Sequence, residues 1–173
     1  MAHYPGSTAN LVSSHGGGMS AHLGLVVHIT TNVYDPRGYF SNPANEASST
    51  WWVREDGWVE EIVDPDLRAW AQAAGNDTYN SAEVSGNEGS LMTDGQLTAL
   101  ARLYAWGHAY YGWPMQLSRW AGDPGLAWHG LGASVGWGHP DCPGPQRVAQ
   151  LPTVLARAAA MLGQPAPQAP ATR

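Results

Sequence analysis

The stretch LGLVVHI at residues 23–29 indicates the fold of this 173-residue sequence. It is a short apolar run rich in β-branched residues, which is typical of a strand buried within a sheet. Its one polar member, His28, stands near the end of the run, where an imidazole is costly unless it has a partner. A lone strand histidine is more often a satisfied core residue than a metal ligand, so the role of His28 depends on the rest of the chain.

Strand and helix patterns alternate after this run. A hairpin is predicted over residues 50–63, because Asp56-Gly57 suits a tight turn with positive φ. Another strand is expected over residues 81–85. A helix that begins with a capping box is predicted over residues 93–111, and a second helix over about 152–163. This order predicts a single-domain α/β fold with a central, mostly mixed β-sheet flanked by helices.

The chain divides into three predicted segments. Residues 1–20 are expected to form an irregular Gly/Ser-rich arm, residues 21–163 the folded domain, and residues 164–173 a disordered Pro/Ala-rich tail. Residues 1–18 lack a basic run followed by an apolar stretch, so no signal peptide is expected. No apolar run is long enough to span a bilayer. We therefore expect a protein that is made in a cytoplasm and is not inserted in a membrane.

The charge balance argues against one class of partner. The formal net charge is −6, and all eight cationic residues are Arg. Because no basic stripe exists, a protein that follows the phosphates of a nucleic acid is not expected. The absence of Lys also removes the commonest ammonium group that could stabilise an oxyanion.

Tryptophan is unusually frequent, with nine Trp against one Phe. Indole rings fill cores, and they also line grooves, because sugars and peptides stack well on aromatic faces. Composition does not separate the two roles for any single Trp. The candidates to line a binding groove are Trp51, Trp52, Trp70, Trp128 and Trp137.

A second group of metal-binding residue types lies in the Gly-rich stretch at residues 128–144. It contains His129, His139, Asp141 and the only cysteine of the chain, Cys142, and spacing alone does not decide which of these four bind a metal. Zinc takes neutral imidazole and thiolate ligands, and a catalytic zinc site has three protein ligands and one open position. Spacing leaves two sets open. His28 and Cys142 pair with either His129 or His139.

The order of these motifs resembles that of the type-2 N-acetylmuramoyl-L-alanine amidases, a family that includes phage lysins and the peptidoglycan recognition proteins. The resemblance runs from Leu25 to about Met161. It rests on LVVHIT at 25–30, SSTWWV at 48–53, RAW at 68–70, YNSAE at 79–83 and CPGPQR at 142–147. The sequence is most similar to lysins of actinobacterial phages, in which a His in a Gly-rich segment precedes a Cys-Pro-Gly-Pro signature.

The resemblance implies a zinc site at one end of the sheet, with His28, His129 and Cys142 as ligands. It favours His129 over His139, because the family's second histidine lies further upstream of the last ligand. It also implies hydrolysis of the amide between N-acetylmuramic acid and L-alanine in bacterial peptidoglycan. The expected protein is a monomeric phage or prophage endolysin that reaches the wall after holin-type release.

Two further roles follow from the resemblance. Glu83 aligns with a strand glutamate that some members use beside the zinc, where a carboxylate can move the proton of the attacking water. The alternative is an exposed or salt-bridged strand residue. Members often have Lys or Thr where this chain has Pro140, and commonly a Tyr–His pair where it has Ser49-Thr50. His139, beside the missing Lys, is therefore the candidate donor to the oxyanion.

Two other functions fit the same sequence. A recognition domain would bind peptidoglycan without cutting it, but Cys142 argues against this, because non-catalytic members generally lack a full ligand set. A wall-remodelling or recycling amidase of the bacterium itself would use the same chemistry, and it also agrees with the missing signal peptide.

Overall fold

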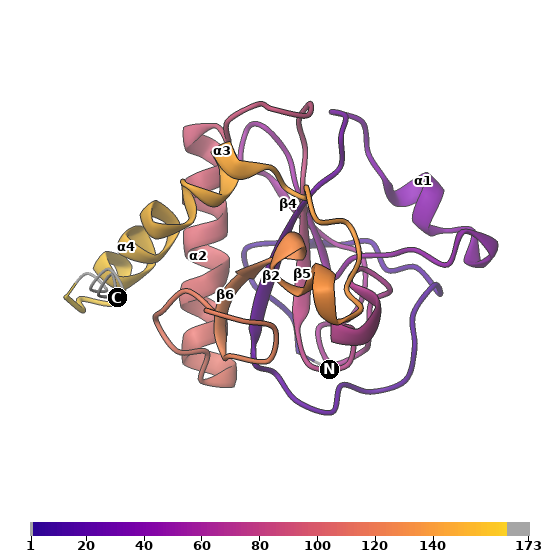
Figure 1. The fold of residues 1–173 in the computed structure, drawn as a ribbon, viewed down its shortest axis with the longest axis horizontal. Helices are drawn as coiled ribbons and strands as arrows, with labels where there is room; N and C mark the ends of the chain where they lie inside the picture. Colours follow the sequence, from indigo (N-terminus) through magenta and orange to yellow (C-terminus); the bar gives the residue numbers. More distant parts are fainter. Residues whose placement is uncertain (1, 166–173) are drawn as a thin grey trace.

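A six-stranded mixed sheet forms the centre of the computed structural model, which describes residues 2–165 (Figure 1). The strand order is β1-β4-β3-β5-β2-β6. The strands are β1 (Thr8–Ala9), β2 (Gly24–Ile29), β3 (Trp51–Val53), β4 (Val59–Glu61), β5 (Asn80–Val84) and β6 (Gly125–Trp128). Only β3 and β4 pair antiparallel, as the predicted hairpin, and the remaining pairs are parallel. The predicted single-domain α/β fold with a mixed central sheet is confirmed.

β2 lies inside the sheet, with β5 on one side and β6 on the other, both parallel to it. Residues 25–27 are fully buried. A parallel strand that is covered on both faces must be apolar along its length, which explains the run at residues 23–29. The register places His28 next to Glu83 of β5. The polar end of a buried strand therefore faces a carboxylate.

Helices cover one face of this sheet. α2 (Asp94–Tyr111) and α4 (Leu151–Met161) pack against each other, on the left in Figure 1. The predicted capping box of α2 is present, and α2 ends at Gly112. Leu100, Leu103 and Leu155 from these helices belong to the main hydrophobic cluster, together with residues of β2, β3 and β5. Within residues 2–165, no helix combines the length and apolarity needed to cross a membrane.

The remaining helical segments are short and lie in the connections. They are α1 (Arg37–Phe40), η1 (Pro43–Asn45), η2 (Ala73–Gly75), η3 (His129–Val135) and α3 (Pro145–Val148). η3 follows β6 directly, and α3 follows Cys142 after two residues. These two connections bring residues 128–144 over the sheet near the end of β2.

The N-terminal segment differs from the irregular arm expected over residues 1–20. β1 pairs with β4, and Ala2 and Tyr4 are buried. Backbone amides of Asn10 and Val12 continue the pairing along the same edge. The free backbone groups of an edge strand offer such partners, and a two-residue strand in a Gly/Ser-rich segment gives no periodic signal. Of the expected tail at residues 164–173, only Gln164 and Pro165 lie within the described part of the chain.

Candidate metal centre

Three side chains with metal-binding atoms meet at the carboxyl end of β2. His28 comes from β2, His129 from the start of η3, and Cys142 from the loop before α3. One ligand atom from each residue lies within 4.8 Å of the other two. Both histidines are buried, and Cys142 is half-buried. Of the two ligand sets that spacing left open, the fold thus brings together the one with His129, in a number that suits a catalytic zinc site.

A buried amide fixes the orientation of the His28 ring. The side-chain nitrogen of Gln72 donates to the carbonyl oxygens of Gly75 at 3.3 Å and Tyr79 at 2.9 Å. Its Oε1 therefore faces His28 Nε2, 3.2 Å away, and accepts the hydrogen on that nitrogen. This hydrogen bond selects the tautomer with a free lone pair on Nδ1, which is the form that can bind a metal.

A backbone carbonyl does the same for His129. Its Nε2 lies 2.8 Å from the carbonyl oxygen of Trp137. A carbonyl oxygen can only accept, so Nε2 carries the hydrogen and Nδ1 is left with its lone pair. Burial lowers the pKa of both rings, and that of His28 lies well below its usual value, with the nearby His129 ring as a second cause. Both imidazoles are therefore neutral at neutral pH, as metal binding requires.

Gly130 allows the ligand loop to close. Its backbone N–H donates to the carbonyl oxygen of Cys142 at 2.8 Å. A Cβ at this position would lie 2.3 Å from the carbonyl oxygen of Pro140, which only a glycine avoids. Burial and then Glu83 raise the pKa of the Cys142 thiol to about 12. A bound cation would favour the thiolate at this position, so the donor set fits zinc.

Glu83 lies beside this group on β5. Its Oε1 is 3.9 Å from His28 Nδ1, and its Oε2 is buried without a hydrogen-bond partner among residues 2–165. Burial raises the pKa of Glu83 to about 7, although the charge of Arg147 opposes the shift. A carboxylate with this pKa can both accept and release a proton near neutral pH.

Sequence reasoning gave no role to two buried residues of this region, Gln72 and Arg147. Arg147 is 1% exposed and donates to the carbonyl oxygens of Val84, Ser85 and Ser90. It thereby ties the segment after Cys142 to the end of β5. No spacing or periodicity in the sequence distinguishes either residue from a surface polar residue. The bond between Gln72 and His28 joins side chains 44 positions apart, and the backbone partners of Arg147 lie at least 57 positions away along the chain.

A cleft of about 790 Å³ opens over the metal-binding group. Of the five tryptophans expected to line a groove, Trp70 and Trp137 do so. Trp51 and Trp52 do not, because they are buried in hydrophobic clusters on opposite faces of β3, as successive residues of a strand must be. Trp128 packs against the main cluster and is likewise not part of the cleft. The expectation is thus corrected for these three residues.

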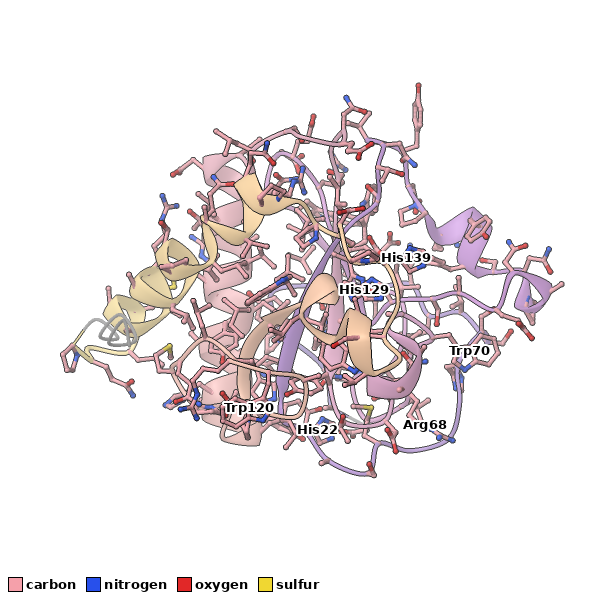
Figure 2. All side chains as sticks on the ribbon, viewed as in Figure 1. His22, Arg68, Trp70, Trp120, His129 and His139 are labelled. Atoms are coloured by element: carbon pink, nitrogen blue, oxygen red, sulfur yellow. The ribbon has the colours of Figure 1, made fainter. Side chains whose placement is uncertain are left out.

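His139 lines the same cleft but lies outside the three-residue group. Its ring centroid is 5.0 Å from that of His129, and Figure 2 shows the two side by side. Its backbone is left-handed, with φ of 47°, and its side chain is exposed. Ser49 and Thr50, where the family commonly has a Tyr–His pair, are instead buried and bonded to Ser81.

A family model described as N-acetylmuramoyl-L-alanine amidase matches residues 19–145, which include the cleft and all three metal-binding residues. The chain belongs to this family. The match agrees with the family resemblance of the sequence.

Solved structures share the amidase fold at low sequence identity. Staphylococcus aureus hydrolase AmiA, solved in complex with its ligand, has a TM-score of 0.72 and 18% identity, over 96% of this chain and 90% of that chain. The N-acetylmuramoyl-L-alanine amidase LysC from Clostridium intestinale has a TM-score of 0.60 and 16% identity, over 91% and 99%. Drosophila peptidoglycan recognition protein PGRP-SA has a TM-score of 0.62 and 21% identity, over 84% and 90%. No curated protein sequence matched the chain significantly.

Proposed function

We propose that this chain is a zinc-dependent amidase that hydrolyses the bond between N-acetylmuramic acid and L-alanine in bacterial peptidoglycan. One observation carries the proposal. His28, His129 and Cys142 converge. Nε2 of each imidazole donates a hydrogen bond, which leaves the Nδ1 lone pair of both rings free for a metal. Membership of the N-acetylmuramoyl-L-alanine amidase family supports the reaction.

Different residues of the chain have different roles in this reaction. Zinc at the three ligands would polarise the scissile carbonyl and activate a water molecule. Glu83, buried beside His28, accepts a proton from the attacking water and delivers it to the nitrogen of the departing L-alanine. His139 donates a hydrogen bond to the carbonyl oxygen as negative charge develops on it. Trp70 and Trp137 contact the glycan and peptide on either side of the bond.

Lysis of purified cell walls tests the proposal. The wild-type protein is expected to give clear zones in a zymogram, a chelator is expected to abolish them, and added zinc to restore them. Cys142→Ser and Glu83→Gln should each lower activity by at least about 100-fold, because they remove a ligand and the proton carrier. Mass spectrometry of the products should show a free L-alanine amino terminus. Tight wall binding without any new amino terminus would instead identify a recognition domain.

A role as a phage or prophage endolysin is the biological setting we propose. In this setting the protein is made in the cytoplasm, leaves through holin-type membrane holes and acts on the wall as a monomer. The endolysins among the similar structures support this setting, and the relation to actinobacterial phages rests on the Cys-Pro-Gly-Pro signature. Expression in a bacterial host tests it. Lysis that requires a co-expressed holin supports the endolysin, whereas lysis without one favours a bacterial wall enzyme.

A further inference from the structure

A second pocket, of about 370 Å³, adjoins the cleft. The two cavities share Trp70, Ala73 and Asn76 as lining residues, so Trp70 stands at their boundary. Arg68 lines only the second pocket. In the view of Figure 2, His139, Trp70 and Arg68 follow one another down the right side of the molecule. A substrate that extends from the metal-binding group past Trp70 would therefore reach Arg68.

Arg68 supplies a positive charge that the main cleft lacks. The ionisable side chains lining that cleft, apart from its three histidines, Cys142 and Tyr39, are the carboxylic acids Glu46, Glu83, Glu88 and Asp141. The second pocket contains Arg68 and one carboxylate, Asp77, which accepts a hydrogen bond from Ser20 Oγ at 3.1 Å and forms no ion pair with Arg68. The two cavities thus differ in charge, and a group that binds beside Arg68 is expected to be an anion.

The guanidinium of Arg68 has one buried N–H, on Nε, without a partner among residues 2–165. Within residues 2–165 its side chain has no hydrogen bond or ion pair, and its Nε is buried. A buried donor without a partner is unfavourable, and a bound acceptor would satisfy it. Gly16 lies against it, because a Cβ on Gly16 would be 3.0 Å from Nε. The N-terminal segment at Gly16 therefore covers one side of the guanidinium, and the pocket lies on another side.

We propose that the second pocket is a subsite for a carboxylate of the peptide stem, bound by the guanidinium of Arg68 beside the indole of Trp70. The guanidinium fork matches a carboxylate in a bidentate arrangement. A stem peptide offers free carboxylates on its acidic residues and at its C-terminus, and the glycan reaches the cleft from the opposite side of the bond. This subsite rests on the proposed amidase function, since it takes the peptide as the part of the substrate that passes Trp70.

Soluble muramyl peptides that differ in one group test the subsite. One has all carboxylates free, one has the side-chain carboxylate amidated, and one has the C-terminus amidated. For Arg68→Gln we expect a roughly tenfold higher KM on the free acid with an unchanged kcat. The amidated peptide that lacks the bound carboxylate should show no difference between wild type and variant, which identifies the source. Arg102→Gln is the matched control, because Arg102 is exposed and also has no hydrogen bond or ion pair among residues 2–165.

Binding measured by tryptophan fluorescence separates this subsite from the reaction. If the wild-type protein cuts none of the peptides, the proposed amidase function is wrong. Weaker binding of the free acid alone by Arg68→Gln would still support the subsite. Equal losses on acid and amides, or no loss on any peptide, would overturn it. If Arg68→Gln does not fold, the wild type decides: equal affinity for the acid and both amides overturns the subsite, and an acid preference that salt weakens supports it.

Discussion

Gln72 orients His28, one of the three residues of the proposed metal site. It holds the tautomer of His28 through one hydrogen bond and is itself held by two carbonyl groups. Residues that orient a ligand histidine typically contribute 10–100-fold to metal affinity. We therefore expect Gln72→Leu to weaken zinc binding by roughly 10–100-fold, measured by competition with a chromophoric chelator.

The control for this prediction is Gln150→Leu. Gln150 makes a similar pair of hydrogen bonds with the backbone of Met92, but it is bonded to none of the three ligand residues and does not line the cleft. It should cost stability and leave zinc affinity unchanged. Gln72→Glu keeps an acceptor for His28 Nε2 and should bind zinc better than Gln72→Leu. Wild-type zinc affinity in Gln72→Leu would show that His28 orients itself.

Glu83 gives the metal-free protein a pH-dependent stability. Its pKa is about 7 in the folded protein, against a usual value of 4.5. Between these pH values the folded state holds a proton that the unfolded chain has released. The free energy of unfolding therefore falls as the pH rises from about 4.5 to about 7, by at most ~3 kcal/mol. Glu83→Gln should lack this fall and be the more stable protein at pH 8, as urea unfolding of both metal-free proteins would measure. Parallel stability curves for the two proteins would contradict it.

At the scale of elements, the connection from β6 through η3 to α3 provides most of the residues of the site. It supplies His129, His139 and Cys142, and Gly130 lets two parts of it meet. Gly130→Ala forces a Cβ toward the Pro140 carbonyl, so we expect a loss of about 1–3 kcal/mol in stability and weaker zinc binding. Thermal unfolding and the chelator competition measure the two effects.

Gly38→Ala serves as the matched substitution. Gly38 lies in α1, where a Cβ meets nothing within 4 Å. Alanine there should leave zinc affinity unchanged and slightly raise stability, because it restricts the unfolded chain. If Gly130→Ala behaved like Gly38→Ala, the close approach at Gly130 would not be what positions Cys142.

At the scale of the whole molecule, a metal that binds only the folded chain stabilises it by mass action. Zinc at 100 times its dissociation constant should add about 2.7 kcal/mol. For a domain of this size each kcal/mol raises Tm by roughly 2–4 °C, so we expect a shift of about 5–10 °C. Differential scanning calorimetry with and without zinc measures it. Cys142→Ser should lose most of the shift, and an equal shift in that variant would place the metal elsewhere.

Elements whose signals are local could be predicted from the sequence alone. The apolar run at residues 23–29, the Asp56-Gly57 turn and the capping box at Thr93 each specify a strand, a hairpin or a helix through neighbours a few residues apart, and all three are present. The family resemblance added the metal-binding set with His129, which spacing alone had left open against His139.

Which side chains meet depends on the tertiary structure. It buried Trp51 and Trp52 in two cores and left Trp70 and Trp137 in the cleft. It also supplied the partners of the two ligand histidines and joined the N-terminal segment to the sheet edge at β4. The physical reason is the same in each case. Most of these contacts join residues distant along the chain, and the shorter one, between His129 and Trp137, uses a backbone carbonyl group that every residue carries, so neither residue type nor spacing predicts them.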